Sequence, residues 1–113
     1  MSSPAPPDID PQRAALLVDA GQALLLDVRE DDEWQAGRAP AAEHLPLAAL
    51  DPSTVARDRP VIVVCRSGNR SGQAARVLVE GGHDARNLTG GMQAWAAAGL
   101  PVVRGDGEPG EVA

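Results

Sequence analysis

The chain has 113 residues, of which 43% are hydrophobic and 2% aromatic, and its formal net charge is −6. This length suits one domain with an aliphatic core. The acidic balance excludes a general affinity for nucleic acids or anionic membranes, and no apolar run approaches the ~20 residues that a membrane-spanning helix needs.

The two ends of the chain read as flexible tails around a single domain. Residues 1–8 contain three prolines and two serines, and residues 104–113 read RGDGEPGEVA. Neither segment offers much apolar surface to bury, so we place the domain at residues 9–103. The opening residues lack a basic segment followed by an apolar one, so no secretory signal peptide is expected.

The first predicted elements are a helix, a buried strand and a second helix. Asp10 followed by Pro11 is a helix start, with a side-chain cap and a preset φ angle, and Gly21 ends that helix. Residues 23–28, ALLLDV, form a continuous apolar run of the kind that a strand covered on both faces shows. Residues 31–36 predict a short helix.

The rest of the chain continues the alternation of strands and helices. The clearest strand is the β-branched run at residues 61–64, and the clearest helix follows it at residues 71–80. Further strands are expected at residues 42–47 and 85–88, a helical turn at residues 50–56 and a last helix at residues 92–98. Such alternation indicates an α/β fold with a parallel sheet and helices on both faces.

The only cysteine, Cys65, lies where the clearest strand ends, in VIVVCRSGNRS. Ligands of open parallel sheets bind beyond the carboxyl ends of the strands. The loop before the next helix can turn its N–H groups inward and form a cradle for an anion, and Arg66 and Arg70 add positive charge. These effects favour thiolate over thiol, so the pattern predicts an activated sulfur nucleophile.

A purely structural interpretation is also open for each of these residues. A cysteine beside valines is often a small buried hydrophobe, Gly68-Asn69 alone is a turn, and two arginines alone are solvated. The combination of strand, cysteine, small cationic loop and helix start favours the functional interpretation. One cysteine cannot form an internal disulfide, so the expected compartment is the cytoplasm, where a free thiol stays reduced.

Three segments together resemble the single-domain rhodanese-like sulfurtransferases. They are CRSGNRS at residues 65–71, LLLDVREDDEWQAGRAPAAEHLPL at residues 24–47 and NLTGGMQAWAAAGLPV at residues 87–102. The resemblance implies one rhodanese-like domain with a central, mostly parallel five-stranded sheet. It also implies an enzyme of the thiosulfate sulfurtransferase type.

In this resemblance, Cys65 is the catalytic residue. Its thiolate takes a sulfane sulfur from a donor such as thiosulfate, holds it as a persulfide and gives it to a thiophilic acceptor. The implied substrate-binding residues are Arg66, Ser67, Gly68, Asn69, Arg70 and Ser71. The expected partners are a small-molecule sulfur donor, a thiol or cyanide acceptor and a thioredoxin-like protein as a further acceptor. No metal, cofactor, nucleic acid or membrane is expected, and the chain is expected to be a monomer.

Asp27 and Arg29 end the neighbouring strand and are supporting candidates. They could brace the loop through hydrogen bonds and an ion pair. We favour the structural alternative, in which Arg29 pairs with Glu33 and fixes the local fold. His44 is taken as structural too.

Three alternative functions remain open from the sequence. A phosphatase or arsenate reductase of the same fold has five residues between cysteine and arginine, whereas four separate Cys65 from Arg70. A non-catalytic rhodanese-like module would bind a partner protein without using the thiol. A redox sensor would oxidise Cys65 to a sulfenic acid and need an outside reductant, because no second cysteine is present.

Overall fold

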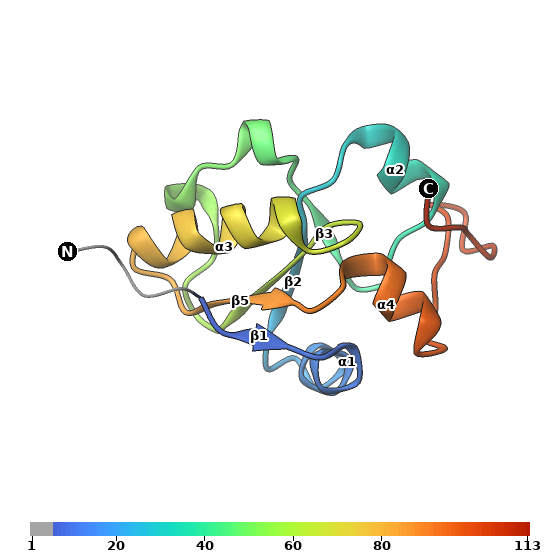
Figure 1. Ribbon diagram of the computed structural model, residues 1–113, viewed down its shortest axis with the longest axis horizontal. Coiled ribbons are helices and arrows are strands. Elements are labelled where there is room, and N and C mark those ends of the chain that lie inside the picture. The colour runs from blue at the N-terminus through green and yellow to red at the C-terminus, as the bar shows by residue number, and fades with distance from the viewer. Residues whose placement is uncertain (1–5) are drawn as a thin grey trace.

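The computed structural model describes residues 6–113, and its centre is a five-stranded sheet in which every neighbouring pair of strands is parallel (Figure 1). The strands are β1 (Asp8–Ile9), β2 (Leu24–Asp27), β3 (Glu43–His44), β4 (Val61–Val64) and β5 (Ala85–Leu88). The helices are α1 (Pro11–Asp19), α2 (Asp31–Ala36), α3 (Asn69–Glu80) and α4 (Gly91–Ala97), with 3-10 turns at η1 (Leu47–Ala49) and η2 (Pro52–Thr54). The spatial order β1-β5-β4-β2-β3 confirms the predicted α/β class and puts β4 in the middle.

Two helices begin where local chemistry favours it. The Asp10 carboxylate accepts a hydrogen bond of 2.8 Å from the Arg13 amide, and Pro11 occupies the first helical position of α1. Glu30 and Glu33 form a reciprocal capping box at the start of α2. Both starts agree with the sequence-based expectation.

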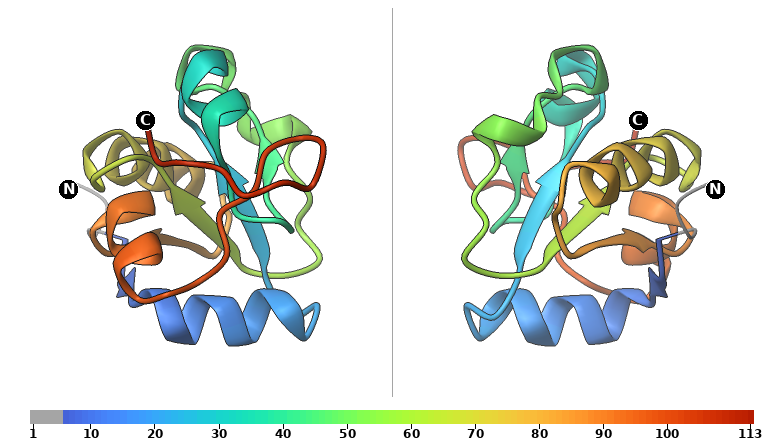
Figure 2. Two further views of the ribbon diagram at one scale, coloured as in Figure 1. Left: turned by 90° about the vertical axis from the view of Figure 1, so that its right-hand side faces the viewer. Right: turned by 90° about the vertical axis from the view of Figure 1, so that its left-hand side faces the viewer.

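Two apolar layers cover the two faces of the sheet. Alternate strand residues, among them Leu25, Ile62 and Leu88, pack with α1 and α4, and the intervening ones pack with α3. Figure 2 shows α1 and α3 on opposite sides of the sheet. Burial on both faces explains the continuous apolar runs of β2 and β4.

The helix after the cysteine begins two residues earlier than predicted. Gly68 adopts φ = 111°, a left-handed conformation that glycine tolerates, and α3 starts at the next residue, Asn69. Ser71 therefore lies inside the first helical turn. Its hydroxyl is free for a long-range contact instead of capping the helix.

Both predicted tails differ from the structure where it describes them. Residues 1–5 lie outside the described residues, but Asp8 begins β1, which pairs with β5. At the other end, Val103 forms antiparallel bridges with Arg38 and Pro109, and the Glu111 amide donates to the Ala36 carbonyl over 3.0 Å. Residues 104–113 thus form a strap that folds back against the end of α2, in place of the free tail that we expected.

No helix in the described part of the chain combines the length and the apolar character needed to cross a bilayer.

Candidate active site

The loop that carries Cys65 is held from behind by the first residues of α4. The Met92 amide donates to the Cys65 carbonyl over 2.7 Å, and the Gln93 amide donates to the Arg66 carbonyl over 3.1 Å. Gly91 permits this contact, since a Cβ there would lie 2.5 Å from both carbonyl oxygens. With these carbonyls bound to α4, the loop keeps a fixed course around the sulfur.

Two hydrogen-bond donors converge on the Cys65 sulfur, which is almost fully buried. The Gly68 amide lies 3.1 Å from Sγ and the Ser71 hydroxyl 3.2 Å, while Cys65 is only 1% exposed. Burial alone would raise the pKa of the Cys65 thiol. The hydrogen bond from the Ser71 hydroxyl, together with the nearby Ser71, Gly68 and Ser67 amides, outweighs burial, so the pKa of the Cys65 thiol lies below its ordinary value.

Asn87 on β5 connects Ser71 to the loop, although no local sequence pattern marks it as a site residue. Its amide oxygen accepts a hydrogen bond of 2.6 Å from Ser71 Oγ, and its amide nitrogen donates to the Gly68 carbonyl over 3.1 Å. The residue is 16 positions beyond Ser71. Only the pairing of β5 with β4 brings it to the loop.

Arg70 forms a two-pronged ion pair with Glu33 of α2. The two nitrogen–oxygen distances are 2.6 and 2.9 Å. The hydrogen bond from Arg70 lowers the pKa of Glu33 to about 2. The same bond raises the pKa of Arg70, and the nearby charge of ionised Cys65 adds to the effect. Arg70 therefore supplies a fixed positive charge close to the sulfur.

The remaining predicted loop residues lie at the surface. Arg66 is exposed, and its Nε donates to the Ala113 carbonyl over 2.9 Å, at the end of the strap. Ser67 and Asn69 are exposed as well. The loop thus has an interior and an outer face. The interior of the cradle consists of Cys65, Gly68, Arg70 and Ser71, and the outer face consists of Arg66, Ser67 and Asn69.

Asp27 and Arg29 form a separate, fully buried ion pair at the end of β2. Both side chains are 0% exposed, and the closest nitrogen–oxygen distance is 2.8 Å. Arg29 also donates to the Gly37 carbonyl over 2.7 Å. The expected pair between Arg29 and Glu33 is wrong, because Glu33 binds Arg70 and Arg29 binds Asp27.

The surroundings of that pair are also structural. His44 Nε2 lies 2.8 Å from the Arg29 carbonyl oxygen, and its ring stacks on Trp34. One Arg29 nitrogen, Nη1, is buried without a partner among the described residues. Within residues 6–113, no three side chains of the types that bind metal ions gather closely enough to hold one.

Comparison with known proteins identifies the family of this fold and loop. The model of the rhodanese-like domain family matches residues 10–98. The chain therefore belongs to the rhodanese-like family, as its three motifs predicted.

Similar proteins include named sulfurtransferases of comparable length. A sulfurtransferase of Allochromatium vinosum is 42% identical over 94 residues, which are 80% of this chain and 88% of that protein. The thiosulfate sulfurtransferase GlpE of Actinobacillus succinogenes is 37% identical over 98 residues, 84% of this chain and 88% of that protein. The crystal structure of a rhodanese-related protein from Thermoplasma volcanium superposes with a TM-score of 0.77 at 31% identity, covering 86% of this chain and 97% of that one.

Proposed function

We propose that this protein is a sulfurtransferase that carries a sulfane sulfur on Cys65 as a persulfide. The observation that supports the proposal most strongly is the convergence of the Gly68 N–H and the Ser71 O–H on one buried sulfur. Donors in this arrangement stabilise negative charge on sulfur, which is the form that attacks. A cysteine with only a packing role has no need of them.

In the first half-reaction, the Cys65 thiolate attacks the outer sulfur of a donor such as thiosulfate. A new S–S bond forms, the old S–S bond breaks, and the leaving group, sulfite for this donor, departs with the bonding electron pair. The thiolate is regenerated in the second half-reaction, when a nucleophilic acceptor takes the terminal sulfur. No external oxidant or reductant is needed in this double-displacement cycle.

Arg66 and Arg70 both contribute positive charge to this mechanism. Arg66 is exposed on the outer face of the loop, where its charge can guide a donor toward the sulfur. Arg70 shares its charge with Glu33 and stays next to the cradle, where it also favours the thiolate. The two arginines therefore have different roles, one in approach and one in stabilisation of charge.

Thiosulfate is the donor that we propose, supported by the name of the relative from Actinobacillus succinogenes. We propose a thiol, cyanide or a thioredoxin-like protein as acceptor, and a monomer acting in the cytoplasm. The loop also differs from a phosphatase loop in the number of residues between Cys65 and Arg70. A shorter loop suits a sulfur atom better than a tetrahedral oxyanion.

Intact-mass spectrometry after treatment with thiosulfate tests the proposal. The wild type is expected to gain one sulfur atom and lose it again on addition of cyanide, and Cys65→Ser is expected to gain none. Absence of any sulfur adduct on the folded wild type, or robust Cys65-dependent hydrolysis of an aryl phosphate, would overturn the proposal.

A further inference from the structure

The hydroxyl of Ser71 has one proton and two acceptors within reach. Ser71 Oγ lies 3.2 Å from Cys65 Sγ and 2.6 Å from the Asn87 amide oxygen. Ser71 is fully buried, so water does not supply a further partner at its surface. The proton can be given fully to only one of the two acceptors at a time.

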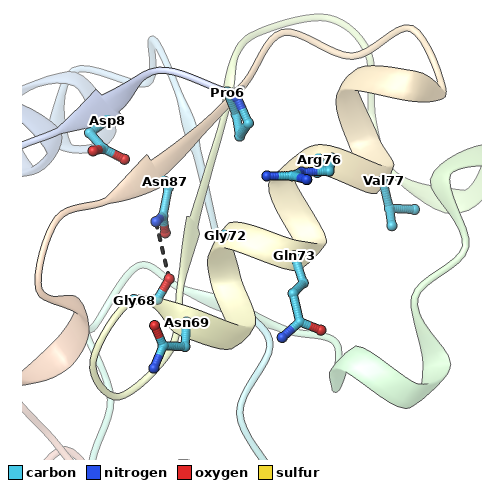
Figure 3. Close-up of a pocket in the computed structure, with 9 residues that line it drawn as sticks. All are labelled: Pro6, Asp8, Gly68, Asn69, Gly72, Gln73, Arg76, Val77 and Asn87. Carbon is cyan, nitrogen blue, oxygen red and sulfur yellow. Dashed lines mark hydrogen bonds between the residues drawn. The ribbon is translucent and has the colours of Figure 1, made fainter. Parts of the chain in front are cut away.

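The other half of the Asn87 amide holds the second donor to the sulfur. Its nitrogen donates to the Gly68 carbonyl over 3.1 Å, as Figure 3 shows beside the pocket that Asn87 lines. The amide of the same residue, Gly68, points at the sulfur. Gly68 has φ = 111°, a conformation with few local restraints for glycine, so the bonds that its carbonyl accepts from Asn87 and from the Gly72 amide, each of 3.1 Å, help to fix its orientation.

We propose that Asn87 is a positioning residue for Cys65, acting through Ser71 and Gly68 as the sulfur changes between thiol and thiolate. In the thiol form, the S–H donates to Ser71 Oγ, and the Ser71 proton goes to the Asn87 oxygen. When the sulfur loses its proton, the Ser71 hydroxyl turns to the thiolate. Throughout, the Asn87 nitrogen keeps the Gly68 N–H directed at the sulfur.

An asparagine serves both contacts because its amide carries an acceptor and a donor at once. An aspartate at position 87 would keep an acceptor for Ser71 but lose the donor to Gly68. It would also hold the Ser71 proton more strongly and place a negative charge one hydroxyl away from the thiolate. All three changes oppose ionisation of the sulfur.

Several charged groups surround Cys65 and stay unchanged in this comparison. Arg70 of α3 is close enough for its pKa to respond to the sulfur, and Glu33 and Glu30 act on Arg70 from α2 and its cap. On the neighbouring strand, the buried pair of Asp27 and Arg29 lies at the end of β2. A shift between wild type and a variant of residue 87 therefore reports on residue 87.

Ultraviolet absorbance of the thiolate, titrated against pH, measures the effect directly. The chain has one cysteine and no tyrosine, so Cys65 alone gives the signal in the relevant range. We expect Asn87→Asp to move the midpoint upward by about one pH unit. Gln73→Glu is the matched control, because Gln73 lines the same pocket, is exposed and takes no part in the described side-chain hydrogen bonds of Ser71 and Gly68. It should move the midpoint much less.

A double-mutant cycle covers the case in which Asn87→Asp does not fold. The midpoint shifts of Asn87→Ala and Ser71→Ala should fail to add in the double variant by about half a unit or more, because part of the effect of Asn87 passes through its bond with the Ser71 hydroxyl. Additive shifts, or an equal effect of Asn87→Asp and Gln73→Glu, would overturn the role of Asn87.

The inference rests on the proposed function, but the two fail separately. Persulfide formation by the wild type is measured on the same preparations. A wild type that takes no sulfur refutes the sulfurtransferase, whereas a wild type that takes sulfur with an unmoved midpoint in Asn87→Asp refutes only the positioning role.

Discussion

The polar groups at the ends of the neighbouring strands β2 and β4 are arranged in opposite ways. At the end of β2, Asp27 and Arg29 neutralise each other in a fully buried pair. After β4, the Gly68 amide and the Ser71 hydroxyl converge on Cys65. At the end of β2 the two charges pair with each other inside the fold, whereas after β4 hydrogen-bond donors converge on one reactive atom.

This difference separates a structural role from a chemical one at the same edge of the sheet. A buried ion pair whose groups bind each other has little capacity to respond to a ligand, but the fold depends on both partners. A sulfur whose charged form is stabilised by hydrogen bonds is prepared for reaction. We therefore expect substitutions at the end of β2 to change mainly the stability of the fold, and substitutions around the loop after β4 to change the ionisation of the thiol.

Replacement of Asp27 by Asn breaks the buried ion pair at the end of β2 and should have the largest effect on stability. Arg29 would keep its charge in the core without a counterion, which lowers the free energy of unfolding by about 3–5 kcal/mol. Urea denaturation measures the loss. Asp84→Asn is the matched control, since Asp84 is 60% exposed and 3.7 Å from Arg86, and it should change stability by less than about 0.5 kcal/mol. Equal effects of the two substitutions would contradict a special role of the buried pair.

Replacement of Gly91 by Ala disturbs the Cys65 loop, which follows β4, from the side of α4. The new Cβ would meet the Cys65 and Arg66 carbonyls and displace the loop. We expect a loss of about 2–4 kcal/mol and a higher midpoint for thiolate formation, as crowding adds to the cost of a positive φ.

Gly21→Ala provides the control for Gly91→Ala. Its φ of 71° is close to the 62° of Gly91, but nothing lies within 4 Å of an added Cβ. It should lose only about 1–2 kcal/mol, the cost of the backbone conformation, and leave the thiolate midpoint unchanged. If both variants move the midpoint alike, the contact between α4 and the loop does not control the sulfur.

Replacement of Glu33 by Gln tests a contact that joins the two strand ends. Glu33 belongs to the helix after β2, and its partner Arg70 belongs to the helix after β4. Gln keeps the capping box but removes the charge. The pKa of Glu33 is lowered from 4.5 to about 2, so its stabilising contribution is complete above the ordinary value and disappears as the pH falls toward 2.

The wild type should therefore exceed Glu33→Gln in stability by about 0.5–1 kcal/mol at neutral pH. Urea denaturation at a series of pH values should show this difference shrinking below pH 4.5, the ordinary pKa of the carboxyl. A difference that does not depend on pH would mean that the ion pair contributes nothing through its charge.

Local patterns in the sequence were sufficient for most of the fold and for the centre of the site. The apolar run of β4, the helix start at Asp10 and the single thiol before a small cationic loop each depend on neighbouring residues. The starts of α3 and α4 lie two residues and one residue earlier than predicted, because a glycine with positive φ directly precedes each helix.

Those local patterns could not predict contacts between residues that are distant in the sequence. Asn87 meets Ser71 through strand register, and Glu33 meets Arg70 across 37 positions. β1 has only two residues, too few for a periodic signal. Residues 104–113 have the composition of a free tail, and backbone hydrogen bonds, which composition does not encode, hold them in place.

The strap also has a practical consequence for experiments on this molecule. The Ala113 carbonyl is within hydrogen-bond reach of Arg66, so a fluorophore or fusion partner attached to Ala113 would begin beside the loop that contains Cys65. Such a label could serve as an optical reporter of donor arrival. A bulky affinity tag at the same point would crowd Arg66 of that loop and is expected to distort kinetic measurements.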